Sequence, residues 1–129
     1  MKKLFSSLMA ILLLSGCNPS DSKLISIGEA EFTPHLKDPE SVKYKEVFFK
    51  QDTEQPASGI SGYVCGLMNA RNGFGGYSGF KPFYIHVTAE PRFLLSFLGV
   101  KYYTSDVGYL KESDSFDEIQ SRCAQMSEK

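Results

Sequence analysis

The sequence of residues 60–88 is ISGYVCGLMNARNGFGGYSGFKPFYIHVT. Its two ends, Ile60–Asn69 and Phe80–Thr88, are rich in the β-branched and aromatic residues that favour strands. In the second, apolar residues occupy every other position from Phe83 to Val87, which is the period of a strand with one buried face. Between the two, Asn72-Gly73 accepts the positive φ values of a tight turn. The stretch therefore predicts an antiparallel hairpin at the centre of the fold.

The C-terminal segment has the clearest helical pattern in the chain. Its apolar residues recur at steps of three, four and three, and they are Phe116, Ile119, Cys123 and Met126. Ser115 and Glu118 have the spacing of a capping box at its start. We expect a helix here with Cys123 on its buried face.

The segments before and after the hairpin have weaker patterns. The residues from Leu24 to Leu36 have loosely helical spacing, and Asp38-Pro39-Glu40-Ser41 is typical of a helix start that would continue to about Tyr44. Glu46–Phe49 is strand-like, and so is Phe93–Tyr103, with Gly99 as a candidate bulge. We therefore predict an α+β fold, in which a small antiparallel sheet is flanked by an N-terminal helical segment and by a C-terminal helix tied by a disulfide.

The first seventeen residues have the order of a secretory signal. Lys2 and Lys3 precede an apolar run, and Leu14-Ser15-Gly16-Cys17 resembles the lipobox of bacterial lipoproteins. The alternative is an uncleaved membrane anchor, but the run is shorter than the roughly 20 apolar residues that span a bilayer. We expect a signal peptide over residues 1–16, a lipidated tether over 17–23 and a single domain over 24–129.

The lipobox-like signal implies a location for the protein, and lipid on Cys17 leaves two other cysteines that can pair. Lipid on Cys17 would hold the protein on a membrane of the cell envelope, and Asn18 in place of Asp favours the outer membrane, with the domain facing the periplasm. Cys65 and Cys123 remain in an exported chain, which favours one disulfide over two buried free thiols. The chain has 14 Lys and Arg against 15 Asp and Glu, so its charge gives no reason to expect nucleic acid as a partner.

The most distinctive motif is the centre of the hairpin. Its Val-Cys-Gly, Asn-Ala-Arg-Asn and Phe-Gly-Gly-Tyr-Ser-Gly-Phe elements resemble those of small uncharacterised bacterial and prophage-encoded proteins, many of them exported. Asp38 to Ser41 and the late Cys123 also fit that pattern, whereas Leu67-Met68 departs from it. The resemblance names a family without an activity.

Five residues of this motif are candidates for binding, because aromatic rings and hydrogen-bond donors together suit a recognition surface. They are Asn69, Arg71, Asn72, Tyr77 and Lys81. The alternative is a purely structural hairpin, whose aromatic residues pack on the sheet and whose glycines satisfy the turn.

Catalysis, metal binding and cofactors have little support in the sequence. His35 and His86 are the only histidines, and neither has the spacing of a metal ligand or of a catalytic base. We expect a non-enzymatic binding or interaction module of the envelope, which contacts the membrane through lipid on Cys17. The sequence does not specify its binding partner, for which another envelope protein is the candidate. A small periplasmic inhibitor of an envelope hydrolase is the second expectation, and an enzyme the third.

Overall fold

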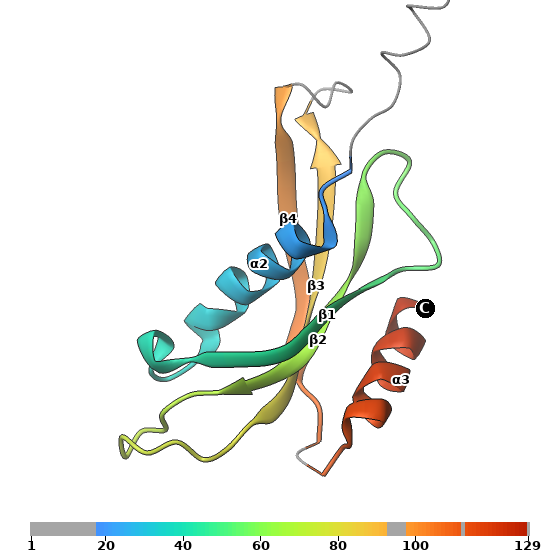
Figure 1. Cartoon of the computed structure of the whole chain (residues 1–129). Coiled ribbons are helices and arrows are strands. Elements are labelled where there is room, and N and C mark those ends of the chain that lie inside the picture. Colours follow the sequence, from blue (N-terminus) through green and yellow to red (C-terminus); the bar gives the residue numbers. More distant parts are fainter. Residues whose placement is uncertain (1–17, 93–97, 112, 129) are drawn as a thin grey trace, which may run out of the picture.

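The computed structural model describes residues 18–92, 98–111 and 113–128, and its core is one four-stranded antiparallel sheet with a helix on each face (Figure 1). The strand order is β1-β2-β3-β4, so each strand pairs with its neighbour in sequence. In chain order the elements are α2 (Asp21–Phe32), η1 (Thr33–His35), η2 (Pro39–Ser41), β1 (Lys43–Gln51), β2 (Ile60–Asn69), β3 (Lys81–Pro91), β4 (Val100–Tyr109) and α3 (Phe116–Ser127). The predicted α+β class is confirmed.

The central hairpin forms as predicted, but its turn differs. β2 and β3 pair antiparallel in continuous register from Ile60↔Ala89 to Met68↔Lys81. Among the described glycines of the connection, Gly75 and Gly79 have positive φ, and Gly73 does not. The expectation of a tight Asn72-Gly73 turn was therefore wrong: the chain turns back between Asn72 and Gly76, and the connection from β2 to β3 is longer than a two-residue loop.

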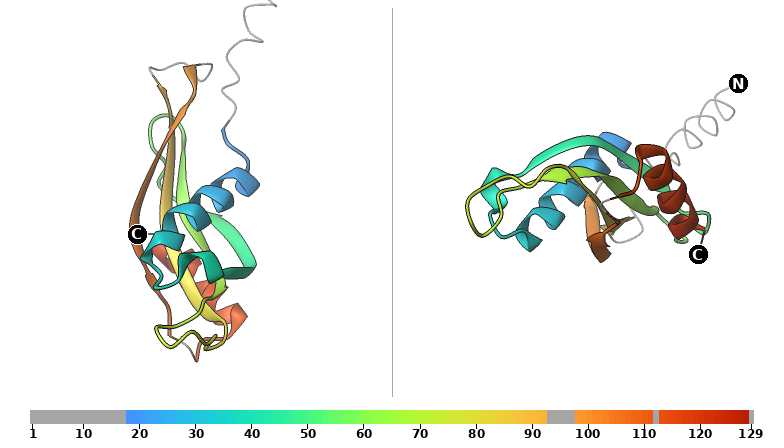
Figure 2. Two further views of the ribbon diagram at one scale, coloured as in Figure 1. Left: turned by 90° about the vertical axis from the view of Figure 1, so that its left-hand side faces the viewer. Right: turned by 90° about the horizontal axis from the view of Figure 1, so that it is seen from below.

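Alternate residues of β2 face two different cores. Val64 belongs to the core under α2, together with Leu24, Phe32 and Phe83, whereas its neighbour Cys65 packs against α3. Because successive strand residues point to opposite faces, α2 and α3 cover opposite sides of the sheet. Figure 2 shows the two helices apart from each other, each against the strands.

The C-terminal helix confirms the sequence pattern and the disulfide. α3 begins at Phe116, and the side chain of Ser115 accepts a hydrogen bond from the backbone N–H of Glu118. Cys123 is fully buried and is bonded to Cys65, 58 positions away in the sequence. The disulfide therefore attaches the C-terminal helix to the second strand.

The N-terminal helix begins earlier than predicted and approaches the sheet closely. Ser20 caps α2, so regular structure starts at Asp21, within the segment 17–23 that the sequence indicated as a tether. A Cβ at Gly28 would lie 2.8 Å from the Cβ of Val64 on β2. A glycine that weakens the helical pattern therefore has a packing role, since it lets helix and strand come close.

The structure corrects the bounds of two further elements and the position of one strand irregularity. η2 ends at Ser41 and Tyr44 already belongs to β1, because the chain turns into a strand after a single helical turn. The predicted strand Phe93–Tyr103 is instead Val100–Tyr109; Gly99 precedes it with φ 99°, and residues 93–97 lie outside the described residues. The irregularity of this strand is at Asp106, which has φ 45°.

The predicted signal peptide, residues 1–16, and the predicted lipidation site, Cys17, also lie outside the described residues. Within the described ranges, no helix has both the length and the apolar character needed to cross a membrane.

Candidate functional site

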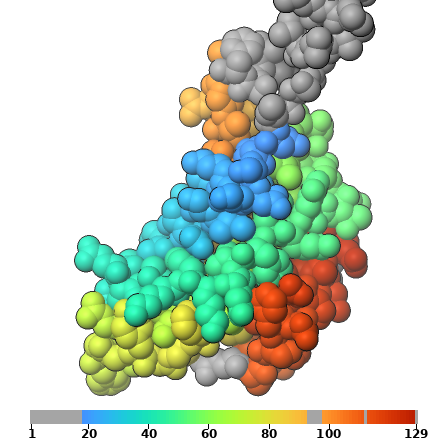
Figure 3. Space-filling model, in the orientation of Figure 1, coloured from blue at the N-terminus to red at the C-terminus, as the bar shows by residue number. Residues whose placement is uncertain are grey.

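Two distant segments of the sequence meet at Ser41. The Ser41 side chain donates to the carbonyl of Asp38 at 2.8 Å and accepts a hydrogen bond from the backbone N–H of Arg71, also at 2.8 Å. The Tyr77 hydroxyl donates to the Ser41 carbonyl at 2.8 Å. Ser41 is only 6% exposed. The segment 38–41 is therefore the support for the connection between β2 and β3, and Figure 3 shows segment 33–41 lying against residues 70–80.

Arg71 and Tyr77 have internal partners on this support. The Arg71 Nε atom lies 3.0 Å from a carboxylate oxygen of Asp38, and the Lys43 amine lies 4.9 Å from the centre of the Tyr77 ring. Both side chains are half exposed, yet their polar groups hold the connection in place. For these two predicted binding residues, the structure favours the structural role.

Asn72 shapes the end of the connection. Its side-chain oxygen accepts hydrogen bonds from the backbone N–H groups of Phe74 at 2.9 Å and Gly76 at 3.2 Å. Its own backbone N–H donates to the Gly76 carbonyl at 2.8 Å. The turn therefore presents Phe74 at its tip, where the side chain is 100% exposed. Phe74 is not among the five binding candidates, although it belongs to the same motif and an aromatic residue between glycines is a visible signal.

Asn69 and Lys81 lie where the two strands of the hairpin meet the connection. Asn69 is half-buried, and its side-chain oxygen has no hydrogen-bond partner among the described residues. Lys81 begins β3 and lines a cavity at the same end of the sheet. The five predicted residues thus lie at one end of the molecule, but they do not form one exposed patch.

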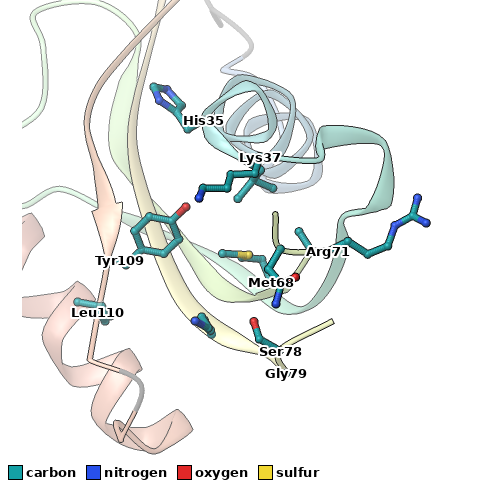
Figure 4. Close-up of a pocket in the computed structure, with 12 residues that line it drawn as sticks. His35, Lys37, Met68, Arg71, Ser78, Gly79, Tyr109 and Leu110 are labelled. Atoms are coloured by element: carbon teal, nitrogen blue, oxygen red, sulfur yellow. The ribbon is translucent and has the colours of Figure 1, made fainter. Parts of the chain in front are cut away.

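The cavity has a volume of about 460 Å³ and lies between segment 35–37, the connection 70–79 and the end of β4 (Figure 4). Arg71, Asn72 and Lys81 are lining residues that the sequence indicated. The lining residues that it missed are His35, Leu36, Lys37, Met68, Ala70, Ser78, Gly79, Tyr109 and Leu110. Most of these come from outside the motif, so no pattern in the sequence placed them beside it.

The lining combines an apolar floor with polar groups at the rim. Met68 is buried below the cavity at 5% exposure, whereas Tyr109 is 52% exposed. In Figure 4 the Lys37 amine and the Tyr109 hydroxyl point toward one another across the cavity, and the Arg71 guanidinium points away from it. The guanidinium of Arg71 therefore pairs with Asp38 and does not contribute its charge to the cavity.

A second polar cluster lies on the α3 face of the sheet. The His86 Nε2 atom is 2.7 Å from a carboxylate oxygen of Asp52, and the same oxygen accepts a hydrogen bond from Ser61 at 2.7 Å. Ser105 Oγ is 3.4 Å from the other nitrogen of His86. That separation is longer than the 2.6–3.2 Å typical of a nucleophile and its base. The cluster ties the loop after β1 to the sheet, a connection that the sequence did not indicate.

Tyr63 completes this cluster beside His86. Its hydroxyl donates a hydrogen bond to Asp106, the residue with positive φ in β4. Burial raises the pKa of Tyr63 well above its usual range, and the hydrogen bond to the Asp106 carboxylate raises it further. The phenol therefore keeps its proton and acts as a donor at neutral pH.

Within the described ranges, no three His, Cys, Asp or Glu side chains are grouped so as to hold a metal ion. No family model matches the chain, and no curated protein and no solved structure is significantly similar to it. The site's own geometry therefore carries the functional argument.

Proposed function

We propose that the protein is a lipid-anchored component of the bacterial cell envelope that binds a partner without catalysing a reaction. The anchor rests on the N-terminal sequence: a short apolar run followed by Leu14-Ser15-Gly16-Cys17. Lipid chains on one cysteine supply the two or more hydrophobic signals that stable membrane attachment requires.

The placement of α2 supports an orientation. The helix starts four residues after Cys17 and runs for 12 residues, or about 18 Å at 1.5 Å per residue. Its far end continues into His35 at the cavity rim, and the connection 70–80 lies at the same end of the molecule (Figure 1). An anchored molecule would thus direct the cavity and Phe74 away from its own membrane.

One observation supports the binding proposal above all others: the cavity and the exposed turn lie together at the end of the sheet where β2 leads into β3. A cavity within the 300–1,000 Å³ range of ligand sites lies beside a well-bonded turn with a fully exposed phenylalanine. Fully exposed aromatic side chains are the kind of group that anchors protein interfaces. The partner is therefore expected to contact the connection 71–80.

A photo-cross-linking amino acid in place of Phe74 tests this in cells. We expect it to yield a discrete cross-linked species in the envelope fraction. The same substitution at Tyr103, which is half exposed near the other end of β4, is the matched control. Equal cross-linking from both positions, or none from position 74, would contradict the proposal.

The Phe74 turn also supports the second candidate, an inhibitor of an envelope hydrolase. An inhibitor needs a rigid, exposed loop that can enter a cleft, and the hydrogen bonds of Asn72 hold this turn in shape. Arg71 is paired with Asp38, so Phe74 and not a basic residue would lead the insertion. Under this candidate, purified protein lowers peptidoglycan hydrolysis by an envelope extract, and Phe74→Ala removes the effect.

The anchor has a separate test. Cys17→Ser is expected to abolish incorporation of labelled fatty acid and to leave the signal segment uncleaved, because the lipid is attached through the thiol. A Ser15→Ala variant keeps a small residue before the cysteine and is expected to incorporate lipid normally. Labelling of the Cys17→Ser variant would remove the basis of the lipoprotein assignment.

A further inference from the structure

The residues that line the cavity at the end of the sheet indicate the kind of ligand that it would bind. An inference about this ligand rests on the proposed function, because it concerns the same site. The walls come from segment 35–37, the connection 70–79 and the end of β4. None of the described lining residues is Asp or Glu. A cationic ligand would therefore find no carboxylate in the described lining to balance its charge.

Lys37 is the group best placed to meet an anion. Its amine points into the cavity toward the Tyr109 hydroxyl (Figure 4), and among the described residues it has no hydrogen-bond or ion-pair partner. Tyr109 likewise directs its hydroxyl inward, with its ring 5.6 Å from that of Phe32 in an edge contact. One ammonium and one phenol hydroxyl can together bind two oxygens of one small anion, the ammonium by a charge-assisted hydrogen bond.

The rest of the lining favours an apolar group next to that anion. Met68 forms the buried floor, and Leu36, Ala70 and Leu110 line the walls. A methionine floor is flexible and polarisable, so it adapts to aliphatic groups of different shape. A cavity of about 460 Å³ holds a small molecule or the last residue or two of a peptide, not a folded domain.

We propose that this cavity binds an organic carboxylate with an apolar side group, its carboxylate between Lys37 and Tyr109 and its apolar part on Met68. Inorganic phosphate fits less well, because the forked guanidinium of Arg71 points away and is paired with Asp38, and because phosphate has no apolar group to place on Met68. The carboxylate belongs either to a small acid or to the C-terminus of a peptide, and both present the same chemistry.

The test is a titration of the full-length lipidated protein in nanodiscs, with the methionine methyl groups labelled for NMR. The probes are N-acetyl-leucine, its amide, the tripeptide Ala-Ala-Leu with a free C-terminus, and inorganic phosphate. We expect N-acetyl-leucine to shift the Met68 methyl signal and the amide to bind about tenfold more weakly, because it lacks the charge. Tighter binding of the tripeptide would identify a peptide C-terminus as the source, and equal or weaker binding a small acid.

Two variants and one control complete the design. Lys37→Gln is expected to weaken N-acetyl-leucine binding about tenfold and Tyr109→Phe about threefold, through loss of one charged and one neutral hydrogen bond. Lys101→Gln removes a lysine at the other end of β4 and should leave the affinity unchanged. Each variant's thermal midpoint is measured alongside, so that a loss of binding with an unchanged midpoint is assigned to the site.

The inference is overturned if the amide binds as well as the acid, if Lys37→Gln binds normally, if phosphate displaces N-acetyl-leucine, or if no carboxylate moves the Met68 signal. Cross-linking from position 74 reports on the proposed function independently. Cross-linking without carboxylate binding would refute only the proposed ligand class. Carboxylate binding without cross-linking would refute only the proposed protein partner.

Discussion

At the scale of single residues, Ser41 decides what the predicted binding residues do. Its side chain accepts a hydrogen bond from the backbone N–H of Arg71, and its carbonyl accepts one from the Tyr77 hydroxyl. Both Arg71 and Tyr77 were predicted to bind a ligand. Their exposure alone would suggest a free surface, but their polar atoms are engaged. Exposed area and available chemistry therefore differ at this site.

Tyr77→Phe tests this role. The change removes the hydrogen bond to the Ser41 carbonyl but keeps the ring beneath Lys43, so we expect unfolding to become easier by about 1 kcal/mol. Urea unfolding measures the change. Tyr103→Phe is the control, because Tyr103 is similarly exposed and its hydroxyl has no hydrogen-bond partner among the described residues. Equal stability of the two variants would show that the Ser41 contact contributes nothing.

Tyr63 gives the fold a dependence on alkaline pH. Its pKa in the folded protein is raised by burial and by Asp106, whereas in the unfolded chain it is about 10. The unfolded state therefore loses its proton first, so this contribution to stability is fully present below pH 10 and is lost as the pH rises above it. Tyr63→Phe is expected to flatten the fall of the unfolding free energy as the pH rises above about 10. An unchanged slope would contradict the assignment.

At the scale of elements, the contact between α2 and β2 depends on a missing side chain. Gly28 stands where any Cβ would come within 2.8 Å of Val64, so the helix lies closer to the strand than a larger residue allows. Both residues are buried in the same core. A helix-breaking residue is thus used here for its size.

Gly28→Ala tests whether size or helix propensity dominates. Propensity alone predicts a gain of about 1 kcal/mol, but overpacking typically costs about 1–3 kcal/mol. We expect a net loss of stability, because Val64 is fully buried and has no room to move. Ser26→Ala, at an exposed position of the same helix, is the control, and a more stable Gly28→Ala protein would refute the packing argument.

At the scale of the whole molecule, α3 depends on a cross-link between distant parts of the chain. The helix adds few fully buried apolar side chains to the sheet, chiefly Ile119 and Cys123, and its link to β2 closes a span of 58 positions. A cross-link of this span restricts the unfolded chain strongly.

Cys123→Ser is therefore expected to lower the unfolding free energy by about 2–4 kcal/mol. Hydrogen exchange should rise first in α3, while β2 and β3 stay protected. The double variant Cys65→Ser, Cys123→Ser is the control, because it removes the same bond without leaving an unpaired thiol. If the oxidised and reduced wild-type proteins unfolded at the same urea concentration, the disulfide would have no stabilising role.

Features that depend on residues close together in the chain can be predicted from their pattern. The period-two pattern around Phe83 to Val87, the helical spacing from Phe116 to Met126 and the pair of remaining cysteines were enough to predict the hairpin, α3 and the disulfide. The predicted bounds of helices and strands were wrong where the apolar pattern of the sequence is weak. β4 was misplaced because, as an exposed edge strand, it lacks the continuous apolar run that Phe93 begins.

The set of residues that forms the site depends instead on how the elements pack against one another. The contacts of Asp38 and Ser41 with Arg71 and Tyr77 join segments 30 or more positions apart, and these segments meet because the strand register pairs Lys43 with Asn69 beside them. Lys37 and Tyr109 share a cavity for the same reason. A local sequence pattern predicts which face of a helix or strand a side chain occupies. Which residue from another element lies next to it depends on how the elements pack, and the spacing of residues in the sequence does not specify that packing.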